Sequence, residues 1–344
     1  MTGAVNIFYS TDTGAPTING VAGSLYTTLQ KCLVTGYGSK SGAGWTNPYT
    51  GTNQGVFTMA SGGTGFSFYI NDNTPSIANE ATVIAWQSPT GLDTGTGQWP
   101  LSSQLTAIYS NTLGTPWRKS ESANSTANWW VVAADNNTVY VIISTGLVLN
   151  GTLLCQGFVF GDLGGVASTD SWACCLQGNR VFNNTSCGNW NFSNVGLGLT
   201  DVEGSGQWMA MGPLGIGSSP QYGKYIDSTL QGGVTTQQNG NGSGGNGMGH
   251  LNNAATFPYP NLADGSLVLS QIRIGSNVCV RGHYKGLWAP LQNLPLNHLD
   301  TMTVTSGNLS GKSFLAISVP VTDLSWGSRV APGMILLETS NTWS

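Results

Sequence analysis

The spacing of apolar residues predicts one helix close to the start of the chain. Apolar side chains recur there every three or four residues, which places them on one face of a helix. We expect this helix to run from Ala22 to Thr35 and to end at Gly36. Its apolar stripe comprises Val21, Leu25, Leu29, Cys32 and Leu33. The stripe is expected to pack on a sheet, with Cys32 as a core residue rather than a nucleophile.

Beyond the helix, the pattern changes to short apolar runs that are rich in β-branched and aromatic residues and bounded by Gly, Asn or Pro. Such runs are typical of strands. They lie at residues 4–9, 56–59, 66–70, 82–86, 129–134, 139–144, 153–160, 171–176, 267–269, 271–274, 279–280, 314–319 and 334–338. The clearest pair, 129–134 and 139–144, flanks Asp135-Asn136-Asn137-Thr138, a strong hairpin signal. The sequence therefore predicts a mainly β fold with antiparallel, sandwich-like sheets and one N-terminal helix packed on a sheet.

A Gly- and Asn-rich segment interrupts this rhythm at residues 231–262. Its centre, residues 237–247, has no side chains that can build a core, so we expect a flexible loop or linker, or a segment that becomes ordered against a neighbour. The predicted organisation is a β-rich part with the helix at 1–230, the long Gly/Asn-rich loop at 231–262, and a C-terminal β segment at 263–344 that packs with the first part.

Charged residues are unusually rare. They make up 8% of the chain, against about 25% in ordinary soluble domains. Ser, Thr, Asn, Gln and Gly must therefore cover the surface. Either much of this surface is buried against other subunits, where charge would cost desolvation free energy, or the exterior is simply neutral and rich in hydroxyl groups.

The charge pattern also excludes some partners. The net charge is −4 and there is no basic run, so we expect neither nucleic-acid binding nor attachment to anionic membranes, which both need clustered Lys and Arg. The first residues carry no cationic segment or apolar stretch typical of a secretory signal, and no apolar run reaches the roughly 18 residues of a membrane span. We expect the protein to be made in a cytoplasm.

The histidines and carboxylates do not form a convincing catalytic constellation. His283 and Asp300 would need a serine brought to them by folding to form a triad, and no G-x-S-x-G motif occurs. Two acidic pairs could serve glycoside hydrolysis, which needs apposed carboxylates. They are Asp201 with Glu203 and Asp162 with Asp170. Solvated turns explain these acids more simply, and no catalytic residue is predicted.

Residues 307–313, Gly-Asn-Leu-Ser-Gly-Lys-Ser, are similar to a phosphate-binding loop but depart from it. The glycines are separated by three residues instead of four, and the following segment 314–319 has the pattern of a strand instead of a helix. No nucleotide or other cofactor is predicted. With three His and no C-x-x-C motif, no metal site is predicted either.

The six cysteines allow two interpretations. They are either buried free thiols or include one bridge, from Cys187 in a polar loop to Cys174 or Cys175, or to another subunit. Cys174 and Cys175 are adjacent, so an extended strand directs them to opposite faces and they are poorly placed to bond each other.

Several blocks of sequence, in order along most of the chain, resemble a family of uncharacterised tailed-bacteriophage virion structural proteins. The blocks are residues 10–16, 32–40, 43–46, 117–120, the 129–144 hairpin, 158–162 and 286–291. The resemblance implies a place in the virion and contacts with copies of itself and with other virion proteins. It supplies no catalytic residues.

The expected function is thus a structural or assembly component of a tailed-phage virion, associated with the tail, baseplate or neck, and not an enzyme. A capsid decoration protein is the alternative. A receptor- or glycan-binding virion protein is a further one, because the 12 Trp make an aromatic platform for host-surface sugars conceivable. An enzyme that degrades host polysaccharide comes last.

Overall fold

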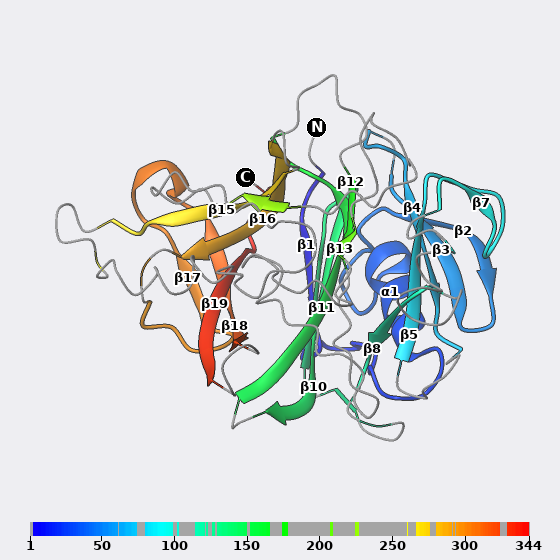
Figure 1. The fold of residues 1–344 in the computed structure, drawn as a ribbon, viewed down its shortest axis with the longest axis horizontal. Helices are drawn as coiled ribbons and strands as arrows, with labels where there is room; N and C mark the ends of the chain where they lie inside the picture. The colour runs from blue at the N-terminus through cyan, green and yellow to red at the C-terminus, as the bar shows by residue number, and fades with distance from the viewer. Residues whose placement is uncertain are drawn as a thin grey trace, which may run out of the picture.

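The fold is mainly β, as predicted, with four antiparallel sheets and one short helix in the part of the chain that the structure describes (Figure 1). This computed structural model describes residues 3–60, 62–73, 80–98, 102, 114–120, 122, 126–127, 129–149, 152–165, 174–177, 207–208, 224–226, 260, 266–275, 280–290, 292, 294–323 and 329–343.

The first sheet, here called the central sheet, has the strand order β1-β9-β10-β11-β12-β13. Its strands are β1 (Asn6–Tyr9), β9 (Trp129–Ala134), β10 (Thr138–Leu149), β11 (Thr152–Asp162), β12 (Cys174–Gln177) and β13 (Gln207–Trp208).

The N-terminal sheet has the order β2-β3-β4-β5-β8, and a two-stranded ribbon extends from it. The strands of the sheet are β2 (Thr46–Gly51), β3 (Gln54–Thr58), β4 (Ser67–Asn71), β5 (Glu80–Trp86) and β8 (Thr115–Arg118), and those of the ribbon are β6 (Ser88–Pro89) and β7 (Gly95–Thr96).

The C-terminal sheet has the order β14-β15-β16-β19-β18-β17. Its strands are β14 (Lys224–Ile226), β15 (Leu269–Gly275), β16 (Val280–Pro290), β17 (Thr301–Thr303), β18 (Ser313–Asp323) and β19 (Arg329–Glu338). A turn of 3-10 helix, η2 (Gly307–Leu309), precedes β18.

The middle of the central sheet, at β9, residues 138–144 of β10 and residues 158–160 of β11, is buried on both faces, which explains why these stretches are almost continuously apolar. On one face, Phe158 and Phe160 of β11 contact Phe68 of the N-terminal sheet, with ring centroids 5.7 and 5.1 Å apart. On the opposite face, Tyr140 of β10 contacts Tyr284 and the C-terminal Trp343. Since neighbouring residues of a strand point to opposite faces, both must be apolar in a sheet enclosed in this way. All six residues of β9 are accordingly buried.

One hydrophobic cluster joins the three large sheets. It includes Leu29 of the helix, Phe57 of β3, Val141 of β10, Leu287 of β16 and Ile317 of β18. The two ends of the described chain also meet, because the Val5 N–H donates to the Asn341 carbonyl at 2.9 Å. The predicted division at 1–230, 231–262 and 263–344 stays a prediction, because the segment meant to separate the two parts lies, except for residue 260, outside the described residues.

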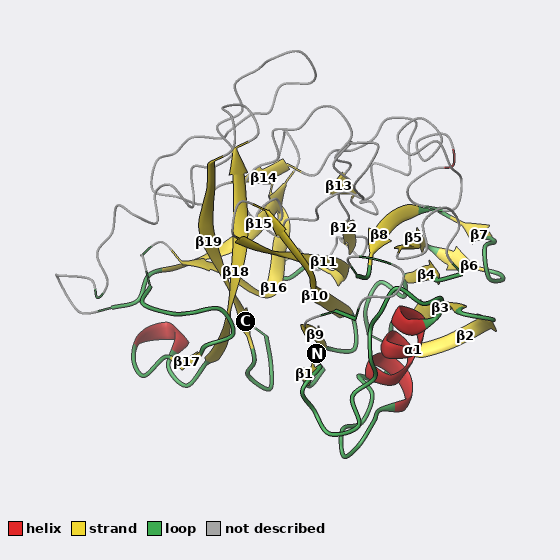
Figure 2. Ribbon diagram, turned by 90° about the horizontal axis from the view of Figure 1, so that it is seen from below, coloured by secondary structure: helices red, strands yellow, loops and turns green. Residues whose placement is uncertain are grey.

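The predicted helix exists but is shorter and begins later. Helix α1 (Ser24–Gln30) continues as one turn of π-helix, η1 (Lys31–Thr35), so the predicted end at Thr35 is confirmed. Figures 1 and 2 show α1 against the N-terminal sheet. Leu25, Leu29, Cys32 and Leu33 are fully buried, as expected.

Val21 was wrongly placed on the apolar stripe of this helix. Its side chain is 58% exposed, because the residue precedes the helix and does not share its periodicity. The start of the helix is fixed by tertiary contacts of residues 25 and 26, described below, and Ala22 and Gly23 remain outside it.

The hairpin prediction is confirmed: β9 and β10 pair antiparallel with Val139 opposite Ala134. The segment after residues 307–312 is a strand, as expected. The short strand β2 was missed, because its sequence Thr-Asn-Pro-Tyr-Thr-Gly has no apolar alternation. Its residues lie half-buried or exposed at the sheet edge, where packing places few demands on side chains.

Candidate functional site

The most connected polar cluster lies at the β9–β10 turn, where Asp135 organises the backbone. Its Oδ1 accepts hydrogen bonds from the N–H groups of Asn137 and Thr138, at 2.8 and 2.7 Å. The Asp135 N–H donates to the Thr138 carbonyl at 3.0 Å. Aspartate commonly stabilises turns through such bonds to its own following backbone. The Asp135 carboxylate therefore stabilises the hairpin turn through contacts within the turn itself.

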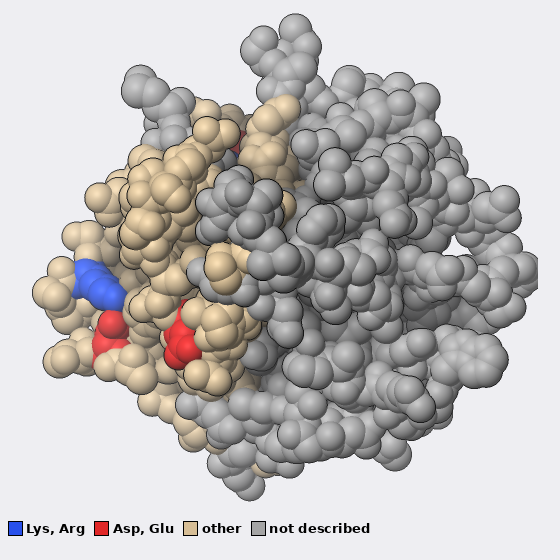
Figure 3. Space-filling model, turned by 90° about the vertical axis from the view of Figure 1, so that its left-hand side faces the viewer, with Lys and Arg blue, Asp and Glu red and all other residues tan. Residues whose placement is uncertain are grey.

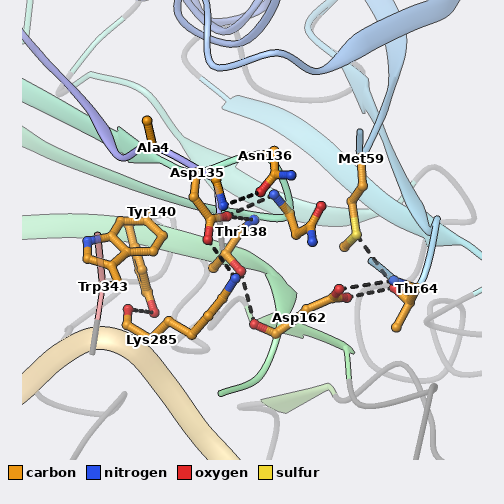
Figure 4. Close-up of polar contacts among 12 residues, drawn as sticks. Ala4, Met59, Thr64, Asp135, Asn136, Thr138, Tyr140, Asp162, Lys285 and Trp343 are labelled. Carbon is orange, nitrogen blue, oxygen red and sulfur yellow. Dashed lines mark hydrogen bonds and ion pairs between the residues drawn. The ribbon is translucent and has the colours of Figure 1, made fainter. Parts of the chain in front are cut away.

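A lysine from the C-terminal sheet pairs with the second oxygen of the Asp135 carboxylate. Lys285 of β16 donates from Nζ to Asp135 Oδ2 at 2.7 Å, and its main-chain carbonyl accepts from the Tyr140 hydroxyl at 2.8 Å (Figure 4). The Asp135 side chain is 0% exposed and that of Lys285 9%. Because a buried carboxylate without its partner would be left uncompensated, this contact couples the central sheet to the C-terminal sheet.

Asp162, at the end of β11, connects the same turn to the N-terminal sheet. Its carboxylate accepts from the Thr64 N–H at 3.0 Å and the Thr64 hydroxyl at 2.6 Å. Its main-chain carbonyl accepts from the Thr138 hydroxyl at 2.9 Å. Burial raises the pKa of Asp162, and this effect exceeds the lowering by the two Thr64 hydrogen bonds. Gly63 permits the close approach, since a Cβ there would lie 2.4 Å from Asp162 Oδ2.

Further segments converge on the turn. The indole N–H of Trp45 donates to the Asp135 carbonyl at 2.7 Å. The Gly3 N–H donates to Asn136 Oδ1, and the Ala60 N–H to the Asn136 carbonyl, both at 3.0 Å. Figure 4 shows Asp135, Asn136, Thr138, Asp162, Lys285 and Thr64 meeting around this turn. We call the set Asp135, Asn136, Thr138, Asp162, Lys285 and Thr64 the hairpin cluster.

The hairpin cluster has the properties of a structural joint. Both Asp135 oxygens and both Asp162 oxygens are occupied by donors of the protein itself. Among the residues that the structure describes, no group of three or more His, Cys, Asp or Glu could hold a metal ion. The role of the hairpin cluster is to hold strands of three sheets together at one point.

A second buried ion pair lies at the start of α1. Asp72, which follows β4, contacts Lys119, which follows β8, and both side chains are 0% exposed. The other carboxylate oxygen, Oδ2, accepts from the N–H groups of Leu25 and Tyr26 at 2.8 and 3.1 Å. α1 has no side-chain cap of its own, so a carboxylate from a distant strand satisfies backbone groups that the helix leaves free.

A third pair lies nearer the surface. Asp12 Oδ2 accepts from Lys40 Nζ at 2.6 Å, and from the Tyr37 hydroxyl and the Tyr9 N–H, both at 2.8 Å. Burial alone would raise the pKa of Asp12, but these hydrogen bonds together with the positive charge of Lys40 lower it. Burial and the Asp12 contact raise the pKa of Tyr37 far above its ordinary value. The cluster holds the loop after β1 against the turn after η1.

The residues considered for catalysis lie in separate surroundings. Asp300 Oδ2 accepts from the Asn297 N–H at 2.7 Å in a local turn. His283 pairs through its backbone with Gly164. Another histidine, His298, has its ring centroid 4.6 Å from that of Trp129. Burial lowers the pKa of His298. Of the acids weighed for glycoside hydrolysis, Asp170, Asp201 and Glu203 lie outside the described residues, whereas Asp162 belongs to the hairpin cluster.

Of the six cysteines, the structure describes the side chain of Cys32 and the backbone of Cys155, Cys174 and Cys175. Cys32 is a buried free thiol whose pKa is raised well above its usual value by burial, in agreement with its assignment to the core. Cys174 and Cys175 begin β12, opposite Asp162 and Gly161, but their side chains lie outside the described part. Cys187 lies outside it altogether, so the proposed bridge stays a prediction.

Sequence reasoning did not single out Asp72, Lys119, Asp135 or Lys285. One signal was available: in a chain with so few charges, each is a candidate for an internal role, and Asp135 stood within the predicted hairpin. The lysine partners are 47 and 150 residues distant in the sequence, and local pattern carries no information about such pairings.

No protein-family model matches this chain. A comparison with curated proteins also finds no match. Among the described residues, no helix is long and apolar enough to cross a membrane.

Proposed function

We propose that this protein is a structural or assembly component of a tailed-phage virion, associated with the tail, baseplate or neck. The place in a phage particle rests on the sequence resemblance. The structural role is supported by how the chain uses its few charges.

The observation that carries the proposal is the burial of charge. Among the charged residues whose side chains the structure describes, only Asp93 is exposed, and the others are buried or half-buried. Eight of them form four ion pairs: Lys40–Asp12, Lys119–Asp72, Lys285–Asp135 and Lys312–Glu338. Figure 3 shows the result on one face, where the described surface is mostly uncharged.

A neutral surface suits repeated contacts between identical subunits. Burying an exposed charge in an interface costs desolvation free energy unless an opposite charge lies directly across the interface. Hydroxyl and amide groups can form hydrogen bonds in many arrangements. Particles are assembled from such repeated contacts around symmetry axes. The chain thus uses charge to join its own strands, and leaves an exterior suited to its own copies and to other virion proteins.

The glycan-binding alternative loses support in the described region. An aromatic platform for sugars needs exposed rings, but the seven Trp whose side chains the structure describes are all buried. They are Trp45, Trp86, Trp117, Trp129, Trp130, Trp288 and Trp343. A glycan array would test the alternative directly.

The proposal is tested by quantitative mass spectrometry of purified particles of the phage that encodes the chain. We expect the chain in a low, fixed copy number relative to the major coat protein, as in a ring of the tail, baseplate or neck. Hundreds of copies would identify the capsid decoration alternative. Absence of the chain from washed, infectious particles would refute a structural role in the virion.

A test on the isolated protein addresses the contacts themselves. Because we expect the subunit contacts to lack ion pairs, the association measured by light scattering should change little between low and high salt. Dissociation by salt would show that charged contacts hold the subunits together and would contradict the proposed use of the surface.

A further inference from the structure

Asp72 and Lys119 are positioned for more than an ion pair. Both side chains are fully buried, and Lys119 Nζ is in direct contact with Asp72 Oδ1. Nζ also donates to the Val21 carbonyl at 2.7 Å. The two reacting groups are thus fixed by β4, β8 and the segment before α1, which removes most of the entropic cost of bringing an amine to a carboxyl carbon.

The two oxygens of Asp72 have different partners. Oδ1 faces the lysine, whereas Oδ2 accepts from the backbone N–H groups of Leu25 and Tyr26. Paired backbone N–H groups on a carbonyl oxygen polarise it and stabilise the negative charge that develops when a nucleophile attacks the carbon. One oxygen is therefore held as a future carbonyl and the other is free to leave.

We propose that Lys119 and Asp72 condense to an intramolecular amide, a covalent cross-link between the segments that follow β8 and β4. A proton passes from the Lys119 ammonium to Oδ1, which gives an amine and a carboxylic acid. The nitrogen lone pair then forms a bond to Cγ, and the π-electrons of the carbonyl move to Oδ2, where the two N–H groups hold the charge.

The step is completed without any other reactant. A second proton moves from the nitrogen to Oδ1, the Cγ–Oδ1 bond breaks, and Oδ1 leaves as water while Oδ2 becomes the amide carbonyl. One ammonium and one carboxylate become one amide and one water, with no change in oxidation state.

The surroundings favour the product. Burial raises the pKa of Asp72 and lowers that of Lys119, so the neutral acid and amine become more accessible than in water. In the amide, Oδ2 keeps its two donors and the single remaining N–H can keep Val21 as its acceptor. Condensation thus replaces two buried charges with a neutral group that retains its hydrogen bonds.

The other ion pairs differ in ways that matter for this reaction. At Asp12, the lysine and the other donors share one oxygen, Oδ2, and the Lys40 side chain is 35% exposed. In the Lys285–Asp135 pair, as at Asp72, one carboxylate oxygen accepts from the lysine and the other from two backbone N–H groups. The Lys285 side chain, however, is 9% exposed. Among the ion pairs of the described residues, this pair is the most closely matched comparison. The inference does not depend on the place of the protein in a virus particle.

The test is the intact mass of the purified full-length chain under denaturing conditions, measured at once and after prolonged storage. We expect a mass below that of the sequence by one water. Digestion should give a branched peptide that joins the Lys119 and Asp72 segments. Lys119→Arg, which retains the charge but not a nucleophilic amine, should have the complete mass, whereas the matched control Lys285→Arg should still lack one water.

The wild-type measurement decides the matter even if a variant fails to fold. A complete sequence mass after storage, with the Lys119 segment recovered only as a linear peptide, would overturn the proposal. So would a missing water that maps to another residue.

Discussion

At the residue scale, the ionisable groups are distinguished by whether hydrogen bonds outweigh the cost of burial. Asp12 receives three donors at one oxygen and its pKa is lowered. Asp162 also receives hydrogen bonds, but burial dominates and its pKa is raised. The two carboxylates should therefore contribute to stability with opposite dependence on pH.

The first prediction concerns Asp12→Asn. Because the carboxyl pKa is lowered in the folded state, the unfolded chain binds more protons in acid. The contribution of Asp12 to stability is therefore fully present above its unfolded pKa of about 4, and it is lost as pH falls through the folded pKa. The variant should be less stable than wild type at neutral pH, by about 1–3 kcal/mol for a lost charged hydrogen-bonding group. The difference should shrink in acid. Urea unfolding at several pH values measures it, and a constant difference would contradict the assignment.

The second prediction, for Asp162→Asn, has the opposite sign. A raised folded pKa means that the native state binds more protons, so stability falls as pH rises from the unfolded pKa through the folded one. Asparagine removes this titration and can still pair with Thr64, so the fall should be weaker in the variant. The same unfolding series measures it. A steeper decline than in wild type would show that the ionised form is the stabilising one.

At the element scale, helix α1 is held by its surroundings more than by its own sequence. It has seven residues and no side-chain cap, and helices this short are unstable alone in water. Buried leucines on one side and the Asp72 carboxylate at its start compensate for this. The apolar spacing predicted the buried side correctly, whereas the starting residue was decided by a carboxylate 47 residues further along the chain.

The third prediction tests this packing. Leu29→Ala removes a fully buried side chain between the helix and the sheets and should lower the free energy of unfolding by about 2–5 kcal/mol. Thr27→Ala on the exposed side of the same helix is the matched control and should change stability by no more than about 0.5 kcal/mol. Equal melting temperatures for Leu29→Ala and wild type would remove Leu29 from the core.

At the scale of the whole molecule, three sheets meet at one turn. Asp135 and Lys285 link the central and C-terminal sheets, and Asp162 links the same turn to the N-terminal sheet through Thr64. Buried polar joints of this kind fix one arrangement of strands, because any other arrangement leaves a charge without its partner.

The fourth prediction follows from this arrangement. Lys285→Met should lower the free energy of unfolding by about 3–5 kcal/mol, because Asp135 is left buried and charged. Adding Asp135→Asn should restore part of the loss, since asparagine can still accept from the turn N–H groups. Lys31→Met on η1, where the side chain is half-buried, is the control. Additive losses in the double variant would show that the pair is not coupled.

Local sequence patterns correctly predicted the β class, the 129–144 hairpin, the buried side of α1 and the core position of Cys32. These follow from periodicity and turn chemistry, which act over a few residues. The pairing of the charges, by contrast, depends on long-range contacts. Asp72 finds Lys119, and Asp135 finds Lys285, only when strands far apart in the chain are brought together. The sequence can show that charge is scarce, but a pairing is a property of three-dimensional proximity, and the free energy of a buried charge depends on which partner folding places beside it.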